Sequence, residues 1–206
     1  METLEGIAFD KPFPHLIIEN FYNKEELELV WEEFKFLTKP NKLLEAKDYG
    51  GVVTHTNSHA LILDEVYSKG YRKLSNILTV NRKLFTSDIL DLFAEIEDCC
   101  SIAKDCNYDV TKVRYYHDGE YYKPHTDRAF HFLAFSYFNK EPKKFSGGEL
   151  YFPKYKYKYE CENNSMIIFP GWVEHGVREV SIDNSDYYEG YGRYCISSFF
   201  GCEEKK

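Results

Sequence analysis

A histidine and a carboxylate stand two residues apart at the end of the segment Val113–Asp127, VRYYHDGEYYKPHTD. The segment is typical of a strand, and residues i and i+2 of a strand point to the same face. His125 and Asp127 would therefore converge on one point, as two ligands of a metal ion. The expected third ligand is His175, which ends the apolar run in IIFPGWVEH.

Two histidines and one carboxylate can occupy one face of an octahedral metal ion and leave three positions open. Non-haem Fe(II) oxygenases use this ligand set. A His-x-Asp pair by itself is weak support for such a site, because pairs of this kind also arise by chance. The prediction therefore depends on the elements that would carry the three side chains.

Length and charge narrow the class of protein. We expect a single domain over residues 1–206, in which 1–110 form a support of helices and strands and 111–202 form the catalytic core. The chain has 26 basic and 34 acidic residues, a formal charge of -8. This balance argues against nucleic-acid binding, which needs clustered Lys and Arg.

The sequence favours a protein that is neither exported nor membrane-bound. The first residues lack a basic start followed by an apolar stretch, and no later run approaches the ~20 apolar residues of a membrane span. The six cysteines match no zinc module, and a chain of this length does not need disulfide bonds, so we expect reduced thiols. A cytoplasmic location follows as the expectation.

Two amphipathic helices are expected in the first half of the chain. Asn23 followed by Glu26 is a helix-start signature, and the apolar spacing after it predicts a helix to about Leu37. A second apolar stripe predicts a helix over about 87–103. Both helices would cover one face of a sheet that begins near residue 111.

The second half of the chain reads as short strands separated by turn residues. Eight candidates are 111–117, 120–127, 130–138, 149–152, 155–160, 165–169, 174–180 and 192–200. Eight antiparallel strands favour a double-stranded β-helix, or jelly roll, so we expect a mainly β fold with flanking helices (α+β). In this topology His125 and Asp127 end the second strand and His175 opens the seventh, so that they can meet at one mouth of the sandwich.

Several segments carry a specific family pattern. One is the string Tyr116, Gly119, Tyr122, Pro124, His125 and Asp127. Others are SYFNKEPKKFSGGELYF, IIFPGWVEHGV and GRYCISSFF. Together they resemble the 2-oxoglutarate and Fe(II)-dependent oxygenases, and in particular the prolyl 4-hydroxylase-like branch. The resemblance covers about residues 111–200.

The resemblance implies a role for five residues. His125, Asp127 and His175 would bind Fe(II). Arg193 would hold the far carboxylate of the co-substrate 2-oxoglutarate, and Tyr116 would donate a hydrogen bond to it. The residue type agrees for Arg193, because a guanidinium can clamp a carboxylate with two parallel hydrogen bonds and stays charged when buried.

Arg178 remains open as an alternative anchor for the co-substrate. The stretch between His175 and Arg193 is longer than is usual in the family, with SIDNSDYYEGYG apparently inserted as a loop. In addition, the collagen-type enzymes usually have Lys where this chain has Arg193. Arg178 follows Val177, however, on what should be the opposite face of the strand.

By the resemblance, we expect a dioxygenase that uses Fe(II), 2-oxoglutarate and O2, is stimulated by ascorbate, and hydroxylates an aliphatic carbon. The expected substrate is a prolyl residue in a peptide or protein, because Lys and Tyr residues around 121–159 could line an open groove. The alternatives are a free amino acid or other small molecule, a non-catalytic jelly-roll binding module, and a zinc or cupin-type enzyme with the same ligands. The sequence does not predict the oligomeric state.

Overall fold

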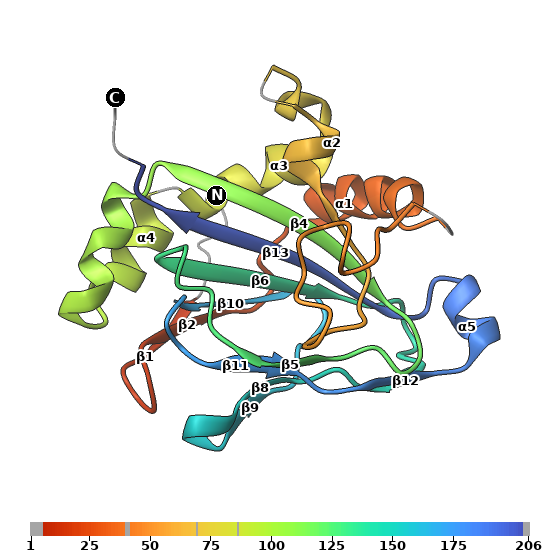
Figure 1. The fold of residues 1–206 in the computed structure, drawn as a ribbon. Coiled ribbons are helices and arrows are strands. Elements are labelled where there is room, and N and C mark those ends of the chain that lie inside the picture. Colours follow the sequence, from red (N-terminus) through yellow and green to blue (C-terminus); the bar gives the residue numbers. More distant parts are fainter. Residues whose placement is uncertain (1–5, 40–41, 69, 86, 204–206) are drawn as a thin grey trace.

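The computed structural model describes residues 6–39, 42–68, 70–85 and 87–203, and it stacks two layers of strands with helices over one of them (Figure 1). The strands are β1 (Gly6–Phe9), β2 (His15–Ile18), β3 (Ala60–Ile62), β4 (Tyr108–Tyr116), β5 (Tyr122–His125), β6 (Phe132–Phe138), β7 (Phe145–Gly147), β8 (Leu150–Phe152), β9 (Tyr157–Tyr159), β10 (Ser165–Pro170), β11 (His175–Val177), β12 (Val180–Ile182) and β13 (Arg193–Gly201). The helices are α1 (Lys24–Leu37), α2 (Leu63–Val66), α3 (Asn76–Val80), α4 (Ser87–Ala94) and α5 (Asn184–Tyr188). The 3₁₀ segments are η1 (Arg72–Leu74), η2 (Asn81–Phe85), η3 (Asp98–Asp105) and η4 (Pro153–Tyr155).

The strands form one large and one small antiparallel sheet and, in addition, the separate pair β7 and β12. The order in the large sheet is β1-β2-β10-β6-β13-β4-β3, and the order in the small sheet is β5-β11-β8-β9. The eight strands that were predicted correspond to β4, β5, β6, β8, β9, β10, β11 and β13. Four of them lie in each sheet, which confirms the double-stranded β-helix. The short pair β7 and β12 was not predicted.

Each central strand of the large sheet separates two hydrophobic clusters. On β13, Ile196 and Phe200 belong to the cluster beneath the helices, whereas Cys195 and Phe199 belong to the cluster between the two sheets. This is the alternation that a strand with both faces buried must show. The face that carries Cys195 is also the face on which the pocket described below opens.

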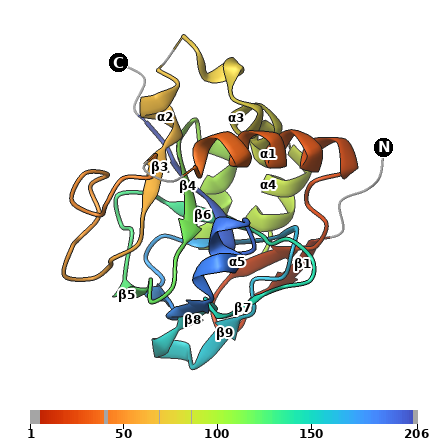
Figure 2. The same cartoon turned by 90° about the vertical axis from the view of Figure 1, so that its right-hand side faces the viewer.

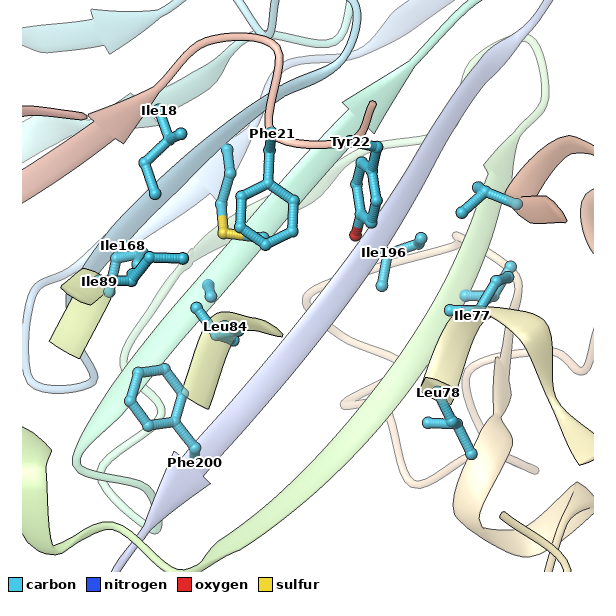
Figure 3. Close-up of a cluster of buried hydrophobic side chains, with 14 of the residues drawn as sticks. Ile18, Phe21, Tyr22, Ile77, Leu78, Leu84, Ile89, Ile168, Ile196 and Phe200 are labelled. Carbon is cyan, nitrogen blue, oxygen red and sulfur yellow. The ribbon is translucent and has the colours of Figure 1, made fainter. Parts of the chain in front are cut away.

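The helices cover the outer face of the large sheet, as predicted (Figure 2). Leu78 of α3, Leu84 of η2 and Ile89 of α4 belong to the same buried cluster as Ile196 and Phe200 of β13, and Ile89 lies beside Ile168 of β10 (Figure 3). The helix side thus has its own core, and the inner face of the sheet is left for the site. No helix among the described residues is long and apolar enough to cross a lipid bilayer.

The first helix was predicted correctly, and the second only in part. Asn23 and Glu26 form the expected capping box at the start of α1, which ends at Leu37. The predicted helix over 87–103 ends at Ala94, because Glu97 adopts an extended backbone and the chain continues as η3. The apolar stripe was nevertheless a correct guide to burial, since its later members lie in the core cluster of the helix side.

A buried asparagine ties the segment after β2 to the turn before β10. The Asn164 side chain accepts a hydrogen bond from the Tyr22 backbone N–H at 3.0 Å and donates one to the Tyr22 carbonyl at 2.8 Å. Its φ of 56° lies in the left-handed region, which asparagine and glycine tolerate best. The Asn164 side chain therefore replaces the backbone hydrogen bonds of a strand at a position where the chain turns.

We expect Asn164→Ala to lower the free energy of unfolding by about 2–4 kcal/mol, because it leaves two buried backbone groups of Tyr22 unpaired and puts a Cβ residue in a left-handed conformation. Asn164→Gly removes the same two hydrogen bonds without the conformational strain, and it should cost roughly 1 kcal/mol less. Urea denaturation of both variants measures the difference. Wild-type stability in both would contradict this account of the turn.

Candidate active site

The three predicted metal ligands meet in one cluster. One ligand atom from each of His125, Asp127 and His175 lies within 4.8 Å of the others. The Asp127 Oδ2 atom is 3.6 Å from Nε2 of His125 and 3.5 Å from Nε2 of His175. The residues described by the structure contain no other group of three such side chains with this closeness.

The two histidines come together through strand pairing. His125 ends β5 and His175 begins β11, and they are direct partners in the antiparallel ladder. The register then shifts, so that Val177 pairs with Tyr122 and β5 carries one extra residue. Pro124 lies in this irregular stretch, where its missing N–H costs the ladder nothing. The bulge thus helps to orient His125 toward its partner.

Backbone carbonyls orient both imidazoles. Nδ1 of His125 is 2.9 Å from the Lys123 carbonyl, and Nδ1 of His175 is 3.0 Å from the Val173 carbonyl. A carbonyl can only accept, so each Nδ1 carries the hydrogen and each Nε2 has its lone pair free. This is the arrangement by which proteins present a histidine to a metal.

Asp127 lies beyond the end of β5, in a turn rather than in the strand as predicted. Its backbone N–H donates to the Gly171 carbonyl at 2.9 Å. A Cβ on Gly171 would lie 2.7 Å from the Asp127 carbonyl oxygen, so this close approach requires glycine. The Pro170-Gly171 turn therefore sets the position of the carboxylate, and strand periodicity does not.

The protonation states suit a divalent cation. Burial by itself would raise the pKa of the Asp127 carboxyl, but the two imidazoles beside it hold the pKa well below its ordinary value. Burial lowers the pKa of His175, which is therefore neutral at pH 7. One carboxylate and two imidazole nitrogens, close together in one cluster, are a donor set that fits Fe(II).

A buried arginine with unused donors lies in the same pocket. Arg193 is only 2% exposed, and its Nε and Nη1 have no hydrogen-bond partner. Nη2 contacts only the Cys161 sulfur, at 3.6 Å. A buried guanidinium with two orphaned donors is costly unless an anion binds there. The arginine therefore fits a ligand carboxylate such as that of 2-oxoglutarate.

Two tyrosines flank the arginine. The guanidinium carbon of Arg193 lies 4.5 Å from the ring centre of Tyr116 and 4.9 Å from that of Tyr137. Burial raises the pKa of Tyr116 to about 12 and holds that of Tyr137 well above its ordinary value, so both hydroxyls keep their protons and can donate. The Tyr137 hydroxyl is buried without a partner. Tyr137 was not predicted, although its alternation with Phe135 on β6 would have pointed it inward.

The Gly-Gly pair of the SGGELYF segment makes room for the arginine. A Cβ on Gly148 would lie 2.5 Å from Cδ of Arg193, and Gly148 has a positive φ of 76°. Any other residue here would displace the Arg193 side chain or strain the turn. The glycine thus belongs to the wall of the pocket.

The pocket has a volume of about 450 Å³ and brings all five predicted residues together. It also contains residues that were not predicted, from β4 and from the loop between α1 and β3. Lys112, Arg114 and His55 are the polar members of this additional set. The loop is attached to β5 through the pairing of Thr56 with Tyr122.

Two other sequence-based expectations find a different place. Arg178 is exposed outside the pocket and stacks on Tyr151, with its guanidinium carbon 4.2 Å from the ring centre. The Lys- and Tyr-rich stretch 154–159 also lies outside the pocket, against a separate surface depression. Of the Lys and Tyr residues around 121–159 that we expected to line a groove, Tyr122 and Tyr137 line the pocket, whereas those of the stretch 154–159 do not.

Comparison with known proteins agrees with this geometry. Residues 111–201 match the family model described as the 2OG-Fe(II) oxygenase superfamily. A search of curated proteins returns no match.

Three solved structures share the fold. A prolyl-4-hydroxylase from Pseudomonas putida has a TM-score of 0.55 at 15% identity, covering 92% of this chain and 93% of that one. A viral collagen prolyl hydroxylase from Paramecium Bursaria Chlorella virus-1 has a TM-score of 0.55 at 16% identity, covering 92% and 96%. A 2OG-Fe(II) oxygenase family oxidoreductase from Burkholderia pseudomallei has a TM-score of 0.58 at 14% identity, covering 91% and 84%.

Such low identities establish the fold and leave the substrate open. The family match covers the strands that carry the ligand cluster and the buried arginine. Residues 111–201 of this chain thus match the model of the 2OG-Fe(II) oxygenase superfamily, and the chain has a fold like that of the prolyl 4-hydroxylases.

Proposed function

We propose that this protein is an Fe(II)- and 2-oxoglutarate-dependent dioxygenase that hydroxylates an aliphatic carbon of a prolyl residue in a peptide or protein. One observation carries the proposal: a His-Asp-His cluster and a buried arginine with orphaned donors share one pocket. A binding module that had lost catalysis would not need both.

His125, Asp127 and His175 would hold Fe(II) through two Nε2 atoms and one carboxylate oxygen. Their orientation is set before any metal binds, because backbone carbonyls hold the imidazoles and the Gly171 turn holds Asp127. Three ligands on one side leave the other side of the ion open toward the pocket. Preorganisation of this kind lowers the cost of binding.

Arg193 would bind the far carboxylate of 2-oxoglutarate, with hydrogen bonds from its Nε and Nη1. The hydroxyls of Tyr116 and Tyr137 would add donors to the same carboxylate. Because all three groups are buried, this anion would be shielded from water and its hydrogen bonds would be strong. The co-substrate would thus lie between the arginine and the metal.

When bound, Fe(II) with 2-oxoglutarate and O2 supplies the oxidising chemistry, in which an aliphatic C–H becomes C–OH while the keto acid becomes succinate and carbon dioxide. The chain contributes position and exclusion of water. Phe135, whose ring centre is 5.7 Å from that of His175, and Phe199, 5.9 Å from Phe135, form an apolar wall beside the ligands. Ascorbate, a reductant, would keep the iron in its Fe(II) form.

The prolyl substrate is supported by the fold and by the apolar wall. Two solved structures with this fold are named as prolyl hydroxylases. A pyrrolidine ring is compact and apolar, and it suits a surface made of Phe135 and Phe199. The pocket of about 450 Å³ has room for the co-substrate and one such ring.

Anaerobic addition of Fe(II) and 2-oxoglutarate should produce the visible charge-transfer band of an iron-keto acid complex. His175→Ala removes one ligand and should abolish the band, whereas His131→Ala, which changes a histidine outside the cluster, should keep it. Absorbance titration measures both. Absence of the band in the wild-type protein would contradict the proposed cofactor set.

Arg193→Met should weaken 2-oxoglutarate binding by at least about 2 kcal/mol, roughly 30-fold, because it removes the buried partner of a carboxylate. Iron binding should be almost unchanged. Arg178→Ala should leave both constants at the wild-type value, since Arg178 lies outside the pocket. Calorimetric titration separates the two ligands, and the reverse pattern would move the anchor to Arg178.

Prolyl peptides should accelerate succinate formation and gain 16 mass units, whereas free proline and other free amino acids should do neither. Mass spectrometry of the substrate, run beside a succinate assay, gives both readings. If free amino acids alone acquire oxygen, the peptide assignment is wrong and the small-molecule alternative replaces it.

A further inference from the structure

Strand β4 places two cations on the pocket face that the proposed metal and co-substrate do not use. Lys112 and Arg114 alternate with buried core residues, and so they share the face of Tyr116. In the pairing of β4 with β13, Tyr116 lies opposite Arg193, Arg114 opposite Cys195 and Lys112 opposite Ser197. Three cationic side chains thus follow one another along the floor of the pocket.

The partners of Arg114 are neutral. Its Nη1 donates to the Tyr49 hydroxyl at 3.1 Å and to the Ser58 hydroxyl at 2.9 Å. Its guanidinium carbon lies 5.0 Å from the ring centre of Tyr49 and 5.5 Å from that of Tyr122. These contacts hold the loop between α1 and β3 against the pocket and leave the charge of Arg114 without a carboxylate.

Lys112 is similarly placed. Its ammonium nitrogen lies 5.2 Å from the ring centre of Phe199 and 5.6 Å from that of Tyr49. Among the described residues Lys112 forms no ion pair with a carboxylate, and Asp127 and Glu65 act on its charge only through the longer-range field. Burial, and next the charge of Arg114, lower the pKa of Lys112 to about 8, so most molecules carry the charge at pH 7.

A count of the charges in the pocket shows that Lys112 and Arg114 lack an anionic partner. Asp127 is the one carboxylate among the described residues that line the pocket. With the proposed ligands bound, the two positive charges of Fe(II) and the one of Arg193 are matched by the single charge of Asp127 and the two of 2-oxoglutarate. Lys112 and Arg114 remain uncompensated, in a partly buried place where an unpaired charge is costly.

We propose that Lys112, supported by Arg114, binds a carboxylate of the substrate. This inference rests on the proposed function and specifies its substrate class. The reacting carbon would lie along the wall of Phe135 and Phe199. The carboxylate would lie beside the Lys112 ammonium group, next to the Phe199 ring. The carboxylate is that of an acidic residue near the target proline, or the α-carboxylate of a small acid.

A single carboxylate fits this place better than a polyanion. Among the described Lys and Arg residues of the pocket, Lys112 and Arg114 are the two that the proposed co-substrate does not use, and the whole chain carries a formal charge of -8. A nucleic acid would need several phosphate contacts and would be repelled by that net charge. Acid recognition is thus local to the pocket.

The test compares ligands that differ only in this charge. Prolyl peptides with Glu at positions flanking the proline are matched with the same peptides carrying Gln, and free amino acids form a further arm. The proteins are wild type, Lys112→Met, Lys112→Glu and the control Lys158→Met, whose lysine is exposed outside the pocket. Binding is measured by calorimetry with 2-oxoglutarate and Zn(II) in place of iron, and turnover by succinate formation.

We expect wild type to bind its Glu peptide at least about tenfold more tightly than the Gln peptide, the range of one charged hydrogen bond. Lys112→Met should remove this preference, and Lys112→Glu should reverse it. Lys158→Met should keep it. The binding constant for 2-oxoglutarate should be the same in all four proteins, which distinguishes lost substrate recognition from misfolding.

Equal binding of Glu and Gln ligands by wild type, or a preference that survives Lys112→Glu, overturns the inference. If the charge preference is found and depends on Lys112 but no succinate forms, the carboxylate site stands and the proposed oxygenase function fails. If a free amino acid is bound and oxidised, the carboxylate that Lys112 binds is the α-carboxylate. If a peptide is bound and oxidised, it is the carboxylate of an acidic side chain.

Discussion

The pairing of β5 with β11 is the constraint on which the rest of the site depends. It sets His125 opposite His175, with ring centres 4.5 Å apart. A slip of one residue would turn one imidazole to the other face of the sheet and remove the metal site. The bulge beside Pro124 accompanies this register, and the close approach of Gly171 to the Asp127 carbonyl holds the carboxylate beside the two imidazoles. The ligands are thus oriented by backbone rather than by one another.

The large sheet forms the wall of the pocket opposite β5 and β11. Its inner face carries charged side chains, and the hydrophobic core on its outer face offsets their cost. Arg193, Arg114 and Lys112 would destabilise a thin sheet, since buried cations need partners. The helices α1, α3 and α4 cover the outer face, where residues such as Phe34, Ile77 and Phe93 are fully buried. This core lets the inner face carry charge for binding. Stability and chemistry therefore occupy opposite faces of the same strands.

The proposed chemistry and the proposed recognition use different parts of one pocket. In the proposed function the His-Asp-His cluster and Arg193 bind the co-substrate, and Gly148 leaves space for the arginine side chain. Lys112 and Arg114 lie on the side of β4 that remains for the substrate. Proteins with the same fold can share the co-substrate part of such a pocket and differ in the substrate part, because a fold does not determine which molecule its site accepts.

Local pattern in the sequence predicted the eight core strands, the first helix with its Asn23 cap, and five residues that the structure brings into one pocket, because strand alternation, capping and the family motif are short-range signals. Only the tertiary structure shows that Arg193 lies in the pocket and Arg178 outside it, since the loop SIDNSDYYEGYG separates Arg193 from His175 in the sequence. It also decided that Asp127 lies in a turn, that the helix before β4 breaks at Glu97, and that Lys112, Arg114 and Tyr137 face the metal ligands. These positions depend on contacts between segments that are distant in the sequence, and local sequence patterns do not contain that information.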